Sequence, residues 1–325
     1  LNTGQRSCYD VEGQEVPCNG TGQDAELRPG VPWPDPRFSP AGDVVHDRLT
    51  GLEWPARPGL LEWPMPWEEA FESVDRLNGG QFGGHDDWRL PNRRELRSVI
   101  SYQTRDPALP DGHPFGDPFL TWYWTSTTAA RHPAYAWYVH LEGGRSFFGH
   151  KREDHMVWPC RGRSTVLPAT GQRASVGADG ELTGEIDDDG RLQTGVPWPE
   201  ARFEVEGDAV LDRLTGLEWT RRADLADGLT ACDEAYGVVE ALRTAGRRWR
   251  LPTLNELESL VDVSTCDPSL PAGHPFTDVR DAYWSSTSSA YEPDWSMVLY
   301  LASGAVGVGQ KKGRSFSVWA VARDT

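Results

Sequence analysis

The sequence predicts an α+β protein of two tandem domains, each with two helices packed on short, mostly antiparallel strands. Three observations predict this fold class. Blocks of sequence occur twice in the same order, and each copy contains two segments with helical spacing of apolar residues. The last third of each copy is divided into short β-like runs by glycine and charged turns. The 325 residues suffice for two domains of ordinary size, each with its own core.

The internal repeat is the strongest feature of the sequence. Asp47–Trp54 recurs without change at Asp212–Trp219, and Trp88–Pro91 recurs at Trp249–Pro252. Matched residues lie between 160 and 167 positions apart, so the two copies are collinear. A period of this length indicates tandem domains, because the repeats of solenoid proteins are much shorter.

The boundary between the copies is predicted in the short segment Ser164–Ala169, which contains a proline. This assigns residues 1–165 to a first domain and residues 166–325 to a second. Residues 1–30, which contain two of the five cysteines, are interpreted as an extension of the first domain.

Two helices are expected in each copy. In the first copy, one helix begins at Trp67 and is stopped by Gly79 and Gly80, and its apolar stripe predicts burial. The other helix follows Pro91, where Asn92 is a capping residue and Glu95 stands three positions later, as in a capping box. The second copy has Thr253 and Glu256 at the corresponding positions. Capping therefore explains the matched glutamates without a catalytic role.

The remaining elements are predicted as strands. Val44–Trp54 alternates around a Thr-Gly turn and indicates a hairpin. Later in the first copy, short runs bounded by turns are expected to form further strands, namely Tyr123–Thr127, Ala136–Leu141, Arg145–Gly149 and Met156–Arg161.

Charge and hydropathy limit the partners of the chain. The net charge is −17, which disfavours nucleic acid as a partner. No apolar run approaches 18 residues, so we predict no membrane span. The chain opens at Leu1 without methionine or signal peptide, and we interpret it as a mature, exported chain that is extracellular or on the cell surface.

The five cysteines agree with an oxidising compartment. Cys8 and Cys18 lie ten positions apart around a turn and predict a hairpin closed by a disulfide. Cys232 and Cys266 are predicted as a second pair between helical segments. Cys160 is then left over, and as a small buried apolar residue it needs no further role.

The search for catalytic motifs is negative. The sequence contains no Gly-x-Ser-x-Gly elbow, no phosphate-binding Gly-rich loop and no His-Glu-x-x-His. The matched residues are mostly Trp, Gly, Pro, Leu and Arg, which is typical of a scaffold, so we predict that the protein is not an enzyme. No cofactor is expected apart from Ca²⁺, for which Asp187, Asp188 and Asp189 offer carboxylate oxygens before a glycine.

Several of the repeated motifs resemble a known family. These are the Thr-Gly-Gln openings at Thr3 and Thr170, the Asp-x-x-Thr-Gly-Leu-x-Trp hairpin, the Trp-Arg-Leu-Pro-x-x-x-Glu-Leu helix start and the Tyr-Trp-(Thr/Ser)-Ser-Thr strand. They are similar to the C-terminal domain of the Legionella collagen-like adhesin, over nearly the whole chain and in both copies. The resemblance implies a fold similar to C-type lectins and to formylglycine-generating enzymes, and an exported, surface-attached or secreted protein. The enzyme chemistry of that superfamily needs specific cysteines, and the two copies share none.

The same resemblance indicates where a ligand would bind. On lectin-like folds the loops after the shared Tyr-Trp strand commonly carry the ligand site, and here these loops differ between the copies. Exposed Trp, Tyr and Arg side chains anchor interfaces and sugars. The predicted ligand-binding residues are therefore Tyr135, Trp137, Arg145, Trp295, Tyr300 and Arg314.

Three functions follow from these observations, in descending order of support. The first is a non-catalytic, adhesin-like binding module for a glycan, a protein or another copy of the chain. The second is a structural subunit of an extracellular filament or surface assembly, in which Leu1–Gly30 docks on a neighbouring subunit. The third is a hydrolase of unfamiliar type.

Overall fold

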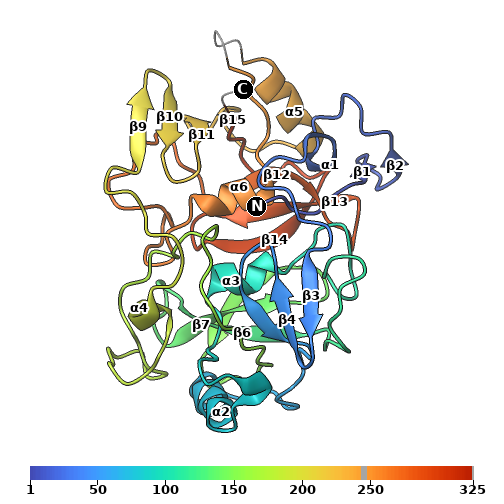
Figure 1. Ribbon diagram of the computed structural model, residues 1–325. Helices are drawn as coiled ribbons and strands as arrows, with labels where there is room; N and C mark the ends of the chain where they lie inside the picture. The colour runs from blue at the N-terminus through green and yellow to red at the C-terminus, as the bar shows by residue number, and fades with distance from the viewer. Residues whose placement is uncertain (243–246, 324–325) are drawn as a thin grey trace. The chain divides into compact units, whose positions relative to one another are not determined.

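The computed structural model describes residues 1–242 and 247–323, which form two compact units (Figure 1). The first unit comprises Pro32–Pro197 together with Leu1, and the second comprises Asn2–Val31 and Trp198–Thr325. Each unit combines a few short helices with mostly antiparallel strands, so the mixed α/β class and the duplication predicted from the sequence are confirmed. No helix among the described residues is both long enough and apolar enough to cross a membrane.

The first unit contains two sets of three antiparallel strands and ends with a short helix. Its elements, in chain order, are β3 (Phe38–Ala41), β4 (Val44–Asp47), β5 (Glu53–Pro55), α2 (Trp67–Gly79), the 3₁₀ turn η1 (Phe82–Gly84), α3 (Arg93–Ser98), β6 (Trp122–Thr128), β7 (Tyr135–His140), β8 (Ser146–His150) and α4 (Asp189–Leu192). Strands β3, β4 and β5 pair in that order, as do β6, β7 and β8. The predicted hairpin and both predicted helices are present. The predicted strand Met156–Arg161 makes only isolated bridges.

The second unit repeats this order with three added strands, β1, β2 and β15. Its elements are β1 (Cys8–Tyr9), β2 (Glu15–Val16), α1 (Asp24–Leu27), β9 (Phe203–Glu206), β10 (Ala209–Asp212), β11 (Leu217–Thr220), α5 (Cys232–Glu240), α6 (Leu254–Ser259), β12 (Tyr283–Ser288), β13 (Trp295–Tyr300), β14 (Ala305–Gln310) and β15 (Val321–Arg323). Strand β15 pairs with β11 on the side opposite to β10. The pairing of β12, β13 and β14 reproduces that of β6, β7 and β8, including a register shift in the first pair.

Each unit has its own aromatic core. In the first unit α2 buries Trp67, Ala70 and Val74 against Trp88 and Trp124. In the second unit α5 packs Cys232, Ala235 and Val239 against matched residues, which include Trp249, Trp284 and Val318. The helical spacing in the sequence therefore identified buried helix faces in both copies.

Matched polar interactions fix the same turns in both repeats. The capping box predicted at the start of α3 is formed by Asn92 and Glu95, and α6 has the same box from Thr253 and Glu256. In each repeat, the aspartate of the hairpin accepts two hydrogen bonds from a buried arginine. Arg37 donates to Asp47, and Arg202 donates to Asp212.

The boundaries of the compact units differ from the domains predicted from the sequence. We call residues 2–31 the first leader and residues 169–196 the second leader, because each precedes a repeat core. The first leader is part of the second unit, and the second leader is part of the first unit. Helix α1 accordingly contacts β12, whereas α4 contacts β6 (Figure 1). The sequence analysis assigned each leader to the core that directly follows it in the chain. No local pattern shows on which core a leader packs.

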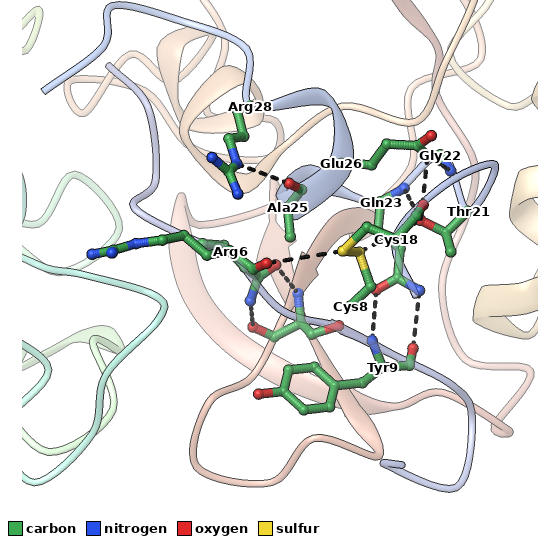
Figure 2. The surroundings of a disulfide bond; sticks show 12 residues. Arg6, Cys8, Tyr9, Cys18, Thr21, Gly22, Gln23, Ala25, Glu26 and Arg28 are labelled. Carbon is green, nitrogen blue, oxygen red and sulfur yellow. Dashed lines mark hydrogen bonds between the residues drawn. A yellow bond between two sulfur atoms is a disulfide. The ribbon is translucent and has the colours of Figure 1, made fainter. Parts of the chain in front are cut away.

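The cysteines are only partly paired as predicted. Cys8 and Cys18 form the expected disulfide, with Cα atoms 5.3 Å apart, in the first leader (Figure 2). The predicted pair of Cys232 and Cys266 is wrong, because both thiols are free. Cys232 is buried in the core of the second unit, whereas Cys266 is partly exposed on a loop. Cys160 is free and buried, as expected, and burial raises the pKa of its thiol.

Candidate ligand-binding face

The six predicted ligand-binding residues do not form one cluster. Tyr135 and Trp295 begin the matched strands β7 and β13, and both are partly exposed. Trp137 is 1% exposed and lies in the core, with the guanidinium of Arg93 4.2 Å from its ring centroid. Direct contact between Trp137 and a surface ligand is therefore ruled out by its burial.

The other predicted residues occupy varied surroundings. Arg314 is exposed and forms an ion pair with Glu234. Tyr300 is partly buried and packs on Phe316, with ring centroids 5.9 Å apart. Arg145 is partly exposed in the turn between β7 and β8. Of these residues, only Arg145 lies beside the aromatic group described next.

Four aromatic side chains gather on one face of the sheet in the first unit. The ring of Trp122 lies 4.7 Å from Tyr138, 4.4 Å from His140 and 6.1 Å from Phe147, measured between centroids. Trp122, Tyr138 and Phe147 are partly exposed, whereas His140 is mostly buried. We call this group the Trp122 face.

The strand register explains why these residues meet. Trp122 pairs with His140 across β6 and β7, and Tyr138 pairs with Phe147 across β7 and β8. Residues two apart on a strand share a face, so both pairs lie on the same side of the sheet. Sequence analysis missed Trp122, Tyr138 and Phe147, although alternation along each strand, combined with a correct register, would have identified them.

Polar groups border the Trp122 face. The backbone N–H of Glu142 donates a hydrogen bond to Nδ1 of His140 at 3.2 Å. Burial, helped by the positive charge of Arg145, lowers the pKa of His140 to about 4. The imidazole is therefore neutral at physiological pH, and the face combines apolar rings with one cation and one carboxylate at its edge.

The predicted calcium ligands have separate roles. Asp187 is exposed and forms an ion pair with Arg191 at 3.0 Å. Asp188 caps α4 by accepting a hydrogen bond from the backbone N–H of Arg191. Asp189 is buried and accepts hydrogen bonds from two threonine hydroxyls. Among residues 1–242 and 247–323, no three or more His, Cys, Asp or Glu side chains are grouped so as to hold a metal ion. Calcium binding stays a prediction.

The second unit has an open pocket of about 780 Å³. Trp249, Leu225 and Leu242 contribute apolar lining, and Arg247 at its edge forms ion pairs with Glu206 and Glu218. None of the six predicted ligand-binding residues lines this pocket.

Comparison with known proteins identifies the family. The model of the Lcl C-terminal domain matches residues 43–161 and again residues 208–322, which together cover more than half of the chain. The chain therefore belongs to the Lcl C-terminal domain family and contains two copies of that domain, as its motifs predicted. Curated proteins and solved structures give no match.

Proposed function

We propose that the protein is a non-catalytic, extracellular or cell-surface binding module, and that its first repeat binds a glycan through the Trp122 face. One observation carries this proposal. Trp122, Tyr138 and Phe147 keep partly exposed rings together on one sheet face, at the edge of the core on which Tyr138 packs. The family match supports an adhesin-like surface domain, and the Cys8–Cys18 disulfide suits an oxidising compartment.

The composition of the face favours a glycan over an apolar ligand. A sugar ring has an apolar side that stacks on aromatic rings and hydroxyl groups that need hydrogen-bond partners at the rim. The phenol of Tyr138, the guanidinium of Arg145 and the carboxylate of Glu142 supply such partners beside the rings. The lectin-like fold implied by the sequence motifs agrees with this assignment, and a protein ligand is the alternative outcome of the test below.

The absence of catalysis is part of the proposal. Asp24 and Asp189 are buried carboxyls with raised pKa values, which is often a sign of an active site. Each of them is buried and accepts hydrogen bonds from two threonine hydroxyls. The hydrolase hypothesis therefore gains no support from the acids that would be its best candidates.

The experiment is a glycan array followed by titration of the best glycan against full-length variants. We expect Trp122→Ala to weaken binding by about tenfold to a hundredfold, since one desolvated aromatic anchor contributes about 1.4–3 kcal/mol. The matched control is Trp63→Ala, which removes a tryptophan that is 73% exposed and lies outside the Trp122 face. Equal affinities of wild-type protein and Trp122→Ala would refute the assignment of the site. An array without any bound glycan would redirect the search to protein ligands.

A further inference from the structure

The two leaders are attached to their cores by the same set of contacts. In the second unit, Oδ2 of Asp24 accepts hydrogen bonds from Thr3 of the leader at 2.7 Å and from Thr287 of β12 at 2.6 Å. In the first unit, Oδ2 of Asp189 accepts hydrogen bonds from Thr170 and Thr127, both at 2.7 Å. Asp24 thus ties the first leader to the end of β12, and Asp189 ties the second leader to the end of β6. We call these contacts the Thr–Asp–Thr lock.

A glutamine in each leader pairs with the backbone next to the lock. The amide of Gln5 donates to the carbonyl of Ser288 at 2.8 Å and accepts from its N–H at 3.0 Å. Gln172 makes the same two hydrogen bonds with Thr128, at 3.2 Å and 2.9 Å. These hydrogen bonds fix the register of the leader on the strand end, because one glutamine side chain binds both backbone groups of a single residue.

A buried lysine of each core completes the docking site. Nζ of Lys311 donates to the carbonyls of Tyr9 and Asp10 at 3.0 Å and 3.2 Å. Nζ of Lys151 donates to the carbonyls of Val176 and Gly177 at 2.6 Å and 3.2 Å. The two lysines are 4% and 0% exposed, respectively. A buried ammonium needs such partners, so the core is incomplete without a leader.

The order of these parts along the chain separates the first leader from the core that it completes. The order is first leader, first core, second leader, second core, and the second leader completes the core that precedes it. The first leader completes the second core, from which the first core and the second leader separate it in the chain.

We propose that the first leader also docks on the second core of another copy, so that the protein self-assembles by leader exchange. The occupant of the site is a second copy of this chain, because the matched contacts show that the docking site accepts a leader of this sequence. The same contacts form within one chain or between chains, and concentration decides between them. Because donor and acceptor surfaces differ, exchange between copies produces either closed rings or open filaments.

The test combines two full-length variants with complementary defects. Asp24→Lys places an ammonium in the lock and disables the first leader, but leaves the second core intact. Lys311→Glu places a carboxylate opposite the carbonyls of Tyr9 and Asp10 and disables the second core, but leaves the leader intact. In an equimolar mixture, the only sound first leader belongs to Lys311→Glu, and the only sound second core belongs to Asp24→Lys.

We expect the mixture to form a one-to-one heterodimer of twice the 36.1 kDa chain mass, and each variant alone to stay monomeric, by light scattering at 10–500 µM. Leu27→Ser, at a 43% exposed position of α1, is the control and should leave the assembly of the wild-type protein unchanged. Circular dichroism verifies that each variant is folded. If Lys311→Glu is unfolded, Lys311→Met replaces it, since methionine keeps the length of the side chain and removes its donors.

A second measurement uses the disulfide-closed peptide of residues 2–31 as the ligand. It should bind Asp24→Lys, whose docking site is free, and bind at least tenfold more weakly to the double variant with Lys311→Glu. A folded mixture that stays monomeric, together with a peptide that does not bind Asp24→Lys, would overturn the proposal. Dimerisation of Lys311→Glu alone would also overturn it, because that variant has no sound second core to accept a leader.

Discussion

Strands β6, β7 and β8 of the first repeat carry Trp122, Tyr138 and Phe147 at positions where the second repeat has Ala282, Val298 and Gly307. The leader contacts, by contrast, are the same in both repeats, from the Thr–Asp–Thr lock to the buried lysine. Duplication followed by divergence has therefore preserved the parts that complete each core and has changed the sheet face. A duplicated protein needs both cores to fold, whereas the proposed ligand binding needs only one such face.

The largest expected effect concerns a feature that the repeats share. Asp47→Ala and Asp212→Ala each remove the carboxylate partner of an arginine. The pairs with Arg37 and Arg202 are almost fully buried, so the arginine that remains is a buried charge without its partner. We expect each substitution to lower the free energy of unfolding by about 3–5 kcal/mol. Urea denaturation followed by circular dichroism measures this loss.

The control for that prediction is an exposed pair in the second repeat. Arg213 and Glu204 are about half exposed, so Arg213→Ala should cost at most about 1 kcal/mol. Clearly unequal losses for Asp47→Ala and Asp212→Ala would mean that the two scaffolds are not equivalent.

The second prediction concerns how pH affects the two leaders. Burial raises the pKa of Asp24 to about 6 and that of Asp189 to about 7, from an ordinary value of 3.8. A docked carboxyl therefore holds its proton more tightly than a free one, and docking is favoured at acidic pH. This contribution is complete below pH 3.8 and is lost as the pH rises through about 6 for the first leader and about 7 for the second. Burial lowers the pKa of Lys151 and Lys311 to about 8, so both lysines stay protonated below pH 7 and add little pH dependence there.

Hydrogen exchange of the leader amides at pH 5 and pH 7.5, corrected for intrinsic rates, measures this effect. We expect stronger protection at pH 5, by about 1.5 kcal/mol for the first leader and about 2.5 kcal/mol for the second. Asp24→Asn and Asp189→Asn should each remove the pH dependence from one leader only. Protection that increases with pH in the wild-type protein would contradict the assignment of these two carboxyls.

The smallest expected effect distinguishes the leaders. Only the first leader contains a disulfide, Cys8–Cys18, and Gln23 holds the neighbouring backbone of Tyr9 by two hydrogen bonds (Figure 2). Replacing both cysteines by serine should loosen the first leader by about 2–3 kcal/mol, because a short covalent loop is lost. Limited proteolysis should then cut residues 2–31 faster and leave residues 169–196 unchanged. Equal acceleration in both leaders would show that their docking is coupled.

Local patterns predicted the scaffold well. The helix starting at Trp67, the capping boxes at Asn92 and Thr253, and the disulfide between Cys8 and Cys18 depend on neighbours within a few residues, and all of them are present. The candidate site was harder to predict. Trp137 and Tyr138 are adjacent, and only the strand register shows that the first is buried and the second is partly exposed. The pairing of Cys232 with Cys266 failed for the same reason, since it depended on distances between distant segments.

The sequence by itself determined that this chain is a duplicated member of the Lcl C-terminal domain family, because the repeated motifs are local and specific. It also determined the two main helices of each repeat, the first hairpin and most strands that follow the helices, because their periodicity depends on neighbouring residues. The short helices α1 and α4 were not predicted. Only the tertiary structure decided that each leader completes the core of the other repeat, and that Trp122, Tyr138 and Phe147 share one face. The physical reason is that both features depend on contacts between residues far apart in the chain. The same local pattern is compatible with several such pairings, and packing and buried hydrogen bonds select one of them.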